Sequence, residues 1–158
     1  LKLSEASRER IIKCRNFLDR KLAESDRPFY GINTGFGSLQ NVKINSKDLA
    51  KLQRNLMLSH ACGTGEFVPV EICKLMLWFK IISLSYGHSG VQIETVERLI
   101  DFYNNDIIPV VYTQGSLGAS GDLAPLAHLT LPLLGEGEVY YNGKLMGSKK
   151  MLNKYCQL

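Results

Sequence analysis

One stretch constrains this chain more than any other. Residues 115–125 read Gly-Ser-Leu-Gly-Ala-Ser-Gly-Asp-Leu-Ala-Pro, with three glycines and two serines. Small residues in tandem let a backbone fold tightly onto itself. In such a turn the backbone nitrogen of Gly121 can reach the carbonyl carbon of Ala119, a contact that larger side chains obstruct. We therefore expect a compressed turn, followed by a helix that Asp122 caps at its N-terminus.

The residues at the centre of this turn can build an electrophile from the backbone itself. Attack of the Gly121 nitrogen on the Ala119 carbonyl closes a five-membered ring, and loss of water gives an imidazolone. Loss of the Ser120 hydroxyl as a second water leaves an exocyclic methylidene. Gly121 has no Cβ to obstruct the attack, and Asp122 is placed to move protons during the dehydrations.

Length and composition predict a single globular domain, 1–158. Hydrophobic residues make up 45% and charged residues 22% of the 158 residues, which is ordinary for such a domain. No apolar run approaches the ~20 residues of a membrane span, and residues 1–25 lack the apolar region of a secretory signal. We expect a cytoplasmic protein with no membrane partner. Lys and Arg are scattered despite a net charge of +4, which argues against a nucleic-acid partner.

The cysteines and histidines do not predict a metal site. The four cysteines, Cys14, Cys62, Cys73 and Cys156, have neither CxxC nor zinc-site spacing, so we expect free thiols. His60 and Cys62 are two residues apart, which would place them on different faces of a helix.

Helical spacing of apolar residues predicts a mainly α fold. The expected helices span 4–24, 46–61, 69–86, 92–105 and 123–134. Ser46 should cap the second helix and Pro69 should occupy the first position of the third. Apolar residues cover much of the circumference of 69–86, so we expect this helix to be buried.

Proline and glycine mark the ends of the later elements. Pro132 should kink or end the fifth helix early, and Gly135 should terminate it. Asn142-Gly143 between apolar flanks predicts a β-hairpin near 138–146. Residues 148–158 are weakly helical, and no alternating βαβ pattern appears, which argues against a dinucleotide-binding fold. His128 is interpreted as a structural histidine.

Three blocks in order resemble the aromatic amino acid ammonia-lyase family, which includes histidine, phenylalanine and tyrosine ammonia-lyases and related aminomutases. Residues 115–128 resemble its signature, Gly-Ser-Leu-Gly-Ala-Ser-Gly-Asp-Leu-Ala-Pro-Leu-Ala-His. Residues 30–37, Tyr-Gly-Ile-Asn-Thr-Gly-Phe-Gly, resemble its tyrosine loop. Residues 53–60, Gln-Arg-Asn-Leu-Met-Leu-Ser-His, followed by Gly-Thr-Gly-Glu at 63–66, resemble its substrate-selectivity helix. The resemblance covers nearly all of 28–146.

The resemblance implies an L-aspartase/fumarase-like fold and an autocatalytic methylidene-imidazolone (MIO) made from Ala119, Ser120 and Gly121. It implies elimination of ammonia from an L-α-amino acid, with Tyr30 as the base that removes a β-proton. Ser59 and His60 resemble the histidine ammonia-lyase pairing, where His60 can hydrogen-bond the imidazole of the substrate. We therefore expect conversion of L-histidine to urocanate and ammonia. Tyrosine or phenylalanine ammonia-lyase or aminomutase activity is the alternative.

Members of this family are several hundred residues long and form homotetramers. We therefore expect residues 1–158 to be the N-terminal fragment of a longer lyase. The alternative is a truncated module that keeps the fold but is not catalytic. The fragment should be inactive alone and should self-associate through apolar surface meant for absent partners. We further expect that MIO is not formed in this chain, because compression of the turn needs the missing helices to hold it.

Overall fold

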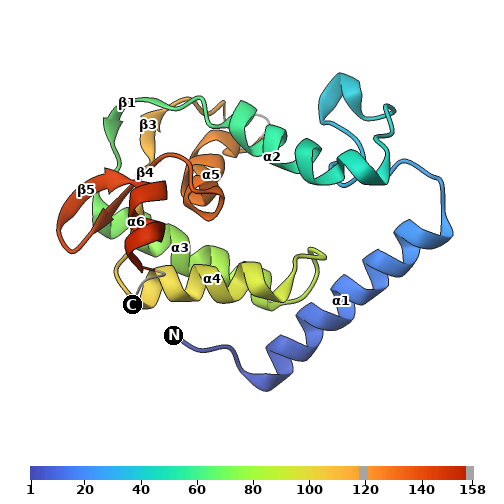
Figure 1. Ribbon diagram of the computed structural model, residues 1–158, viewed down its shortest axis with the longest axis horizontal. Coiled ribbons are helices and arrows are strands. Elements are labelled where there is room, and N and C mark those ends of the chain that lie inside the picture. Colours follow the sequence, from blue (N-terminus) through green and yellow to red (C-terminus); the bar gives the residue numbers. More distant parts are fainter. Residues whose placement is uncertain (118–120, 156–158) are drawn as a thin grey trace.

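A computed structural model describes residues 1–117 and 121–155 of the chain. The fold is mainly helical with two small antiparallel sheets, as Figure 1 shows. Its helices are α1 (Glu5–Glu24), α2 (Leu49–His60), α3 (Val70–Ser85), α4 (Ile93–Asn104), α5 (Leu123–Thr130) and α6 (Ser148–Tyr155). The five expected helices and the weakly helical C-terminal segment are therefore confirmed in outline.

Local chemistry explains where several helices begin and end. Ser4 caps α1, since its Oγ accepts a hydrogen bond from the Ser7 backbone nitrogen at 3.2 Å. Pro69 lies one position before α3, at the N-cap rather than inside the first turn. Helix α5 ends at Thr130 and continues as a 3₁₀ turn, Leu131–Leu134, which contains Pro132. Gly135 follows in the left-handed conformation (φ 73°), as a helix-terminating glycine does.

The second helix begins later than its sequence predicts. A 3₁₀ turn, Ser46–Asp48, precedes α2, and Asp48 rather than Ser46 holds the N-cap position of the α-helix. The Asp48 carboxylate accepts no capping hydrogen bond within the described residues. The expected start at 46 was therefore three residues early, because the chain enters α2 through a tighter turn.

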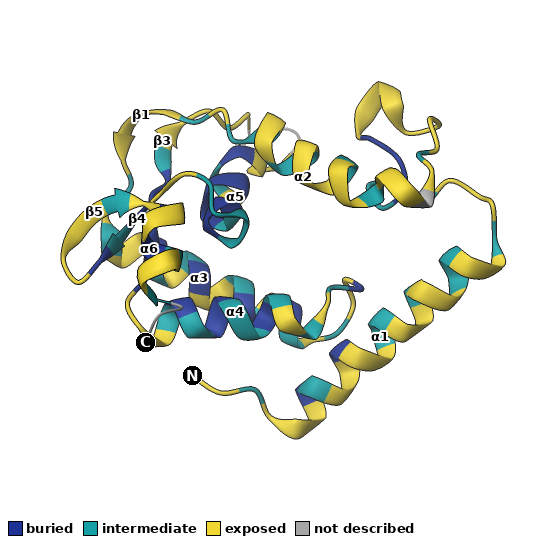
Figure 2. Ribbon diagram, in the orientation of Figure 1, coloured by how far each residue is buried: buried dark blue, intermediate teal, exposed yellow. Residues whose placement is uncertain are grey.

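Two apolar clusters form the core. The larger joins α1, α3 and α4 with the strand region and α5, and its buried members include Ile11, Leu77, Val96, Leu99 and Leu129. The smaller joins the end of α4 to the C-terminal sheet and α6 and contains Phe102, Ile107, Val139, Tyr141 and Met151. Figure 2 shows the buried residues concentrated in α3, α4 and α5, whereas α2 is largely exposed.

The two sheets come from short strands. Strand β1 (Thr64–Phe67) pairs antiparallel with β3 (Tyr112–Gln114). Strand β4 (Glu138–Tyr141) pairs on one side with β2 (Ile108–Pro109) and on the other with β5 (Lys144–Gly147). The β4–β5 hairpin turns at Asn142 and Gly143, both with positive φ, which confirms the expected hairpin. Strands β1, β2 and β3 were not expected from sequence.

Helix α3 is not fully buried, which corrects the expectation drawn from its composition. One face packs into the core through Cys73, Leu77, Ile81 and Leu84. The opposite face exposes large apolar side chains, among them Ile72 (47%), Leu75 (44%) and Phe79 (60%). A helix that is apolar all round is built for partners on more than one side, and within the described residues α3 has them on one side.

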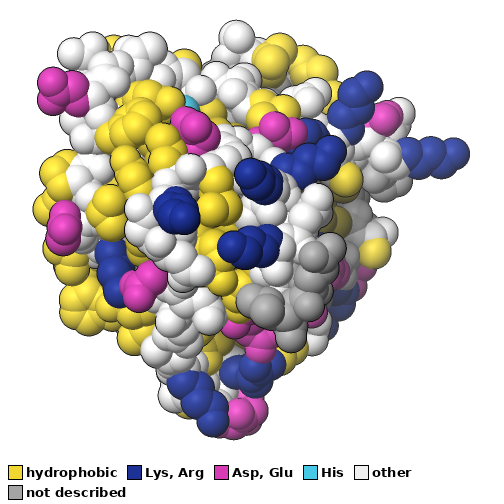
Figure 3. All heavy atoms as spheres, turned by 60° about the vertical axis from the view of Figure 1, so that its left-hand side comes forward, with side chains coloured by type: hydrophobic (Ala, Val, Ile, Leu, Met, Phe, Trp, Pro, Cys, Tyr) yellow, Lys and Arg dark blue, Asp and Glu magenta, His cyan; other side chains and the backbone are white. Residues whose placement is uncertain are grey.

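Charges on the surface are mixed in sign. On the face drawn in Figure 3, Lys and Arg side chains are interspersed with Asp and Glu, and hydrophobic side chains gather toward its left-hand side. No helix among the described residues is long and apolar enough to cross a membrane.

Candidate active site

Tyr30 lies in a loop that buried polar side chains hold in shape. Asn33 is 4% exposed; its Oδ1 accepts a hydrogen bond from the Phe29 backbone nitrogen at 2.6 Å, and its Nδ2 donates to the Arg27 carbonyl at 3.1 Å. Thr34 is fully buried, and its Oγ1 accepts from the Gly31 nitrogen at 3.2 Å. The glycine-rich sequence around Tyr30 is therefore an ordered turn, because its buried polar groups are paired.

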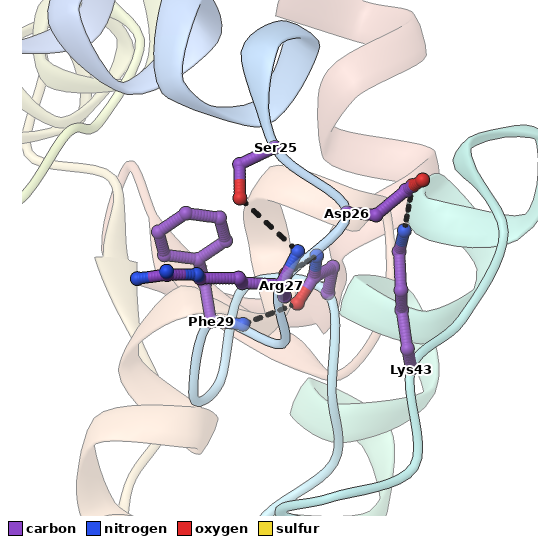
Figure 4. Close-up of polar contacts among 6 residues, drawn as sticks. Ser25, Asp26, Arg27, Phe29 and Lys43 are labelled. Atoms are coloured by element: carbon purple, nitrogen blue, oxygen red, sulfur yellow. Dashed lines mark hydrogen bonds and ion pairs between the residues drawn. The ribbon is translucent and has the colours of Figure 1, made fainter.

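An ion pair closes the base of this loop, as Figure 4 shows. Lys43 donates to Asp26 at 2.5 Å, and the hydrogen bond and charge of Lys43 lower the pKa of the Asp26 carboxyl. Close by, the Arg27 backbone nitrogen donates to Ser25 Oγ at 3.2 Å. Thr34 also forms an antiparallel bridge with Lys43. The entry and exit of the loop are thus held together.

Helix α2 supports the loop from the side. The side-chain amide of Gln53 donates to two successive carbonyls of the loop, Gly31 at 3.0 Å and Ile32 at 2.9 Å. These are the residues that directly follow Tyr30. The position of Tyr30 relative to α2 is therefore set by direct hydrogen bonds.

Three rings connect the loop to the end of α2. The Tyr30 ring lies 5.5 Å from that of Phe36, and Phe36 meets His60 edge-on at 5.3 Å. The Tyr30 side chain is 61% exposed, and its hydroxyl accepts a hydrogen bond from the Gly37 nitrogen at 3.4 Å. The sequence predicted Tyr30 and His60 as site residues independently of each other. In the structure both rings contact Phe36, which connects them. The intermediate role of Phe36 was not foreseen.

Hydrogen bonding at the end of α2 assigns the tautomer of His60. Its Nδ1 lies 2.7 Å from the Leu56 carbonyl, which can only accept, so Nδ1 carries the proton. In the neutral ring, Nε2 is then a hydrogen-bond acceptor. The Ser59 hydroxyl donates to the same carbonyl at 3.1 Å and lies 3.3 Å from His60 Nδ1. Ser59 therefore packs back along its own helix and supports His60.

An open pocket of about 310 Å³ lies between α2 and α5. Its lining is mostly apolar, with Gln53, His60, Lys80 and Thr130 as the polar members. Phe36 and His60 line one wall, and the other wall begins at Leu123, the residue after Asp122. A mostly apolar pocket with a few convergent polar groups is the usual form of a small-molecule site.

The turn at 115–125 is described in part. Ala119 and Ser120 lie outside the described residues, so the expectation for them is not tested. Gly121 has φ +88°, in the left-handed region that favours glycine, and a Cβ built there meets no described atom within 4 Å. Among the described residues, the backbone conformation at position 121 therefore favours glycine, and steric crowding does not.

Asp122 does not cap α5 with its side chain. It holds the N-cap position, yet its carboxylate makes no capping hydrogen bond among the described residues. Its Oδ1 instead accepts from the Ser116 hydroxyl at 2.9 Å. The expected cap is corrected, because the carboxylate is used to join the two ends of the turn.

His128, on α5 behind this turn, is a buried polar group with a clear partner. It is 8% exposed, and its Nε2 accepts a hydrogen bond from the Gly63 backbone nitrogen at 2.9 Å. Burial lowers its pKa from the ordinary value of 6.5. The interpretation as a structural histidine is confirmed, although nothing in the sequence identified Gly63 as its partner.

No cluster of three His, Cys, Asp or Glu side chains suited to a metal ion occurs in the described part of the chain. The described cysteines, Cys14, Cys62 and Cys73, are free thiols, and burial raises the pKa of Cys73.

The sequence and the fold of this chain are similar to those of known proteins. A histidine ammonia-lyase of Deinococcus radiodurans is 50% identical over 152 residues, which cover 96% of this chain and 29% of that protein. A histidine ammonia-lyase structure from Trypanosoma cruzi aligns with TM-score 0.85 at 34% identity, covering 97% of this chain and 29% of that one. A phenylalanine aminomutase structure from Pantoea agglomerans aligns with TM-score 0.90 at 30% identity, covering 97% and 29%.

This chain spans less than a third of the length of these relatives. The fold is shared by proteins named for different reactions, so backbone similarity does not select among them. The family model for aromatic amino acid lyases matches residues 1–156. Phe36 from the tyrosine loop, His60 from the end of α2 and Leu123 from the start of α5 line one pocket. Together with the match over nearly the whole chain, this shows that the chain belongs to the aromatic amino acid lyase family.

Proposed function

We propose that this chain is the N-terminal domain of a longer, L-aspartase/fumarase-like ammonia-lyase that converts L-histidine to urocanate and ammonia. One observation carries the proposal. His60 and Phe36, whose ring contacts both Tyr30 and His60, form one wall of a pocket whose other wall starts at Leu123, directly after Asp122. A substrate ring held beside His60 would thus lie between Phe36 of the tyrosine loop and the start of α5, which directly follows the turn that would supply the electrophile.

His60 supports histidine as the substrate. Its Nδ1 is committed to the Leu56 carbonyl, so the neutral ring offers Nε2 as an acceptor. The imidazole of L-histidine has an N–H to donate, whereas a phenyl ring has none. The 50% identity with a histidine ammonia-lyase supports the same choice over an aminomutase.

In this proposal Tyr30 removes a proton from the substrate, and its contact with Phe36, which lines the pocket, supports that role. Its phenol is largely exposed, and the loop that carries it is fixed to α2 through Gln53. A general base must lie within hydrogen-bond reach of the proton that it removes. Fixing the loop to the same helix that carries His60 would hold the base and the substrate ring in one frame.

The described residues around 115–122 fit an electrophile built from the backbone. Gly121 has a left-handed φ, a Cβ built on it would meet no described atom within 4 Å, and the Ser116–Asp122 hydrogen bond joins the two ends of the turn. Ala119, Ser120 and Gly121 would hold MIO, which supplies an electrophilic carbon to the amine of the substrate. Asp122, whose carboxylate accepts a hydrogen bond from Ser116, would accept and return protons during the dehydrations.

The activity test uses the intact protein that contains this chain. We expect L-histidine to give urocanate, followed by its ultraviolet absorbance, and L-tyrosine and L-phenylalanine to be poor substrates. His60→Leu should lower kcat/KM for L-histidine by roughly ten- to a hundredfold, the effect of one lost hydrogen bond to a buried ligand. Leu58→Ala, on an exposed position of the same helix, is the matched control. Faster turnover of L-phenylalanine than of L-histidine would overturn the assignment.

Residues 1–158 alone should be inactive and should lack MIO. Intact-mass measurement should return the mass of the unmodified sequence. A deficit equal to two water molecules would contradict this, since it would mean that the turn cyclises without the more than two thirds of the relative's length that this chain does not cover.

Assembly is part of the same proposal, with a homotetramer of the longer protein in the cytoplasm. The exposed apolar face of α3, including Ile72, Leu75 and Phe79, supports it, since monomers rarely leave such a surface uncovered. We expect residues 1–158 to self-associate in light scattering, and Phe79→Lys to reduce the apparent mass. A monodisperse monomer at all concentrations would contradict this expectation.

A further inference from the structure

We propose that His128 is a positioning residue that holds the His60 end of α2 in register with the 115–122 turn, acting through the backbone of Gly63. The inference deepens the proposed function and rests on it, because it concerns how the two parts of that site are joined.

The first part of the argument is the hydrogen bond itself. His128 lies on α5 and Gly63 between α2 and β1, 65 residues apart in sequence. The Gly63 nitrogen can only donate, so His128 Nε2 must be an unprotonated acceptor and the ring proton must be on Nδ1. Burial favours this neutral ring. The Tyr112 ring packs edge-on against His128 at 5.0 Å and helps to fix its orientation.

The second part of the argument is that two glycines, Gly63 and Gly115, pack so closely with their neighbours that neither has room for a side chain. A Cβ on Gly63 would lie 2.8 Å from His128 Nε2 and 3.0 Å from the Tyr112 Cβ. A Cβ on Gly115 would lie 2.8 Å from the Gly63 Cα. Gly115 also has φ +127°, which favours glycine independently of space. We call Gly63, Gly115 and His128 the glycine–histidine joint.

The third part is where the joint lies in the chain. Gly63 follows His60 by three residues, Gly115 is the first residue of the 115–125 run, and His128 follows Asp122 by six. Both ends of the turn are therefore held against the same short segment that follows α2. The Ser116–Asp122 hydrogen bond at 2.9 Å also joins the two ends of the turn to each other. A displacement of α5 would move the turn and, through Gly63, the end of α2 that carries His60.

The joint is tested by nuclear magnetic resonance on the chain 1–158. In the wild type, the Gly63 amide proton should follow the titration of the His128 ring with one shared midpoint below 6.5, the ordinary value for histidine. The other titratable side chains that contact the joint are Tyr112, whose ring packs against His128, and Cys62, whose thiol lies 3.9 Å from the Gly115 carbonyl. A Gly63 amide that is insensitive to the His128 titration would overturn the proposal.

Two variants separate positioning from simple burial. His128→Leu fills a similar volume but removes the hydrogen-bond acceptor, whereas His128→Gln keeps an acceptor. We expect Leu to raise amide exchange by roughly tenfold or more, the effect of one lost hydrogen bond, both at 60–64 and at 115–117. Gln should restore protection at both segments. His88→Leu, at an exposed histidine outside the joint, should change neither.

The outcomes remain distinct from those of the activity test. The proposal fails if His128→Leu raises amide exchange in α5 alone. It also fails if His128→Gln does not restore protection at 60–64 and 115–117, because the joint would then not couple the end of α2 to the turn. If His128→Leu does not fold, the wild-type titration decides. Failure of the intact protein to convert L-histidine would overturn the proposed function while leaving the resonance measurements as they are.

Discussion

Helices α2 and α4 are each 12 residues long, yet they are held in opposite ways. Helix α4 buries Val96, Leu99, Ile100 and Phe102 in the core. Helix α2, all of whose residues are described, buries none. Helix α2 is instead held by polar contacts. Gln53 donates hydrogen bonds to the tyrosine loop, and Arg54 forms an ion pair with Glu136. Its apolar residues Leu56 and Met57 line the pocket.

The difference teaches that an amphipathic pattern predicts a helix but not what covers its apolar face. In α4 the face is covered by the protein's own core. In α2 the same kind of face is left open toward α5 and the site. A helix fixed by hydrogen bonds at its polar side can present an apolar surface to a ligand or to another part of the protein without losing its place.

The largest expected effect that distinguishes α4 from α2 comes from truncating one leucine on each helix. Leu99→Ala should lower the free energy of unfolding by about 2–5 kcal/mol, because Leu99 is 1% exposed and its removal leaves a cavity. Leu58→Ala, on α2 at 38% exposure, should change it by less than about 0.5 kcal/mol. Urea denaturation followed by circular dichroism measures both. Equal losses would mean that α2 is as much part of the core as α4.

The next largest effect is expected where the two regions meet. Gly63→Ala should destabilise by about 1–3 kcal/mol, because its Cβ would press on His128 and Tyr112. Gly147→Ala is the matched control, since a Cβ there meets no described atom within 4 Å. Thermal and urea unfolding of the two variants can be compared directly. A Gly63→Ala protein as stable as Gly147→Ala would show that α5 moves aside at little cost.

A smaller and more local effect is expected from Gln53→Ala. Loss of two exposed hydrogen bonds to Gly31 and Ile32 should cost about 1 kcal/mol overall. Limited proteolysis should nevertheless cut the loop at 27–44 faster, since α2 no longer supports it. Gln40→Ala, an exposed glutamine in that loop, should leave the cleavage rate unchanged. Unchanged cleavage in Gln53→Ala would mean that the loop is held by its internal bonds alone.

The smallest expected effect is a dependence of stability on pH. The pKa of His128 is lowered in the folded chain, so the unfolded chain binds a proton first as the pH falls. The contribution of His128 is therefore complete above the unfolded-state value of 6.5 and is lost as the pH falls from there through its folded pKa. Urea unfolding of wild type and His128→Gln between pH 5 and 8 isolates it. Parallel curves would exclude the effect.

Sequence was sufficient for the long elements and for the chemistry of single residues. Helices such as α1 and α4 carry their own apolar periodicity, and Asn142-Gly143 dictates its turn. The strands β1, β2 and β3 have two to four residues and pair with partners far along the chain, so no local pattern marks them. For the same reason Tyr30 and His60 could be named, while Phe36 between them and Gly63 beside His128 could not.

The distance along the chain between Gly63 and His128 also bears on the order of folding. Helices α3 and α4 are neighbours in sequence, so their pairing closes a short loop and loses little chain entropy. The contact between Gly63 and His128 spans 65 residues and can form after the intervening helices have packed. In pulse-labelling hydrogen exchange, the Leu99 amide should gain protection before the Gly63 amide. The site would then be the last part of the chain to take shape, assembled on a core that is already in place.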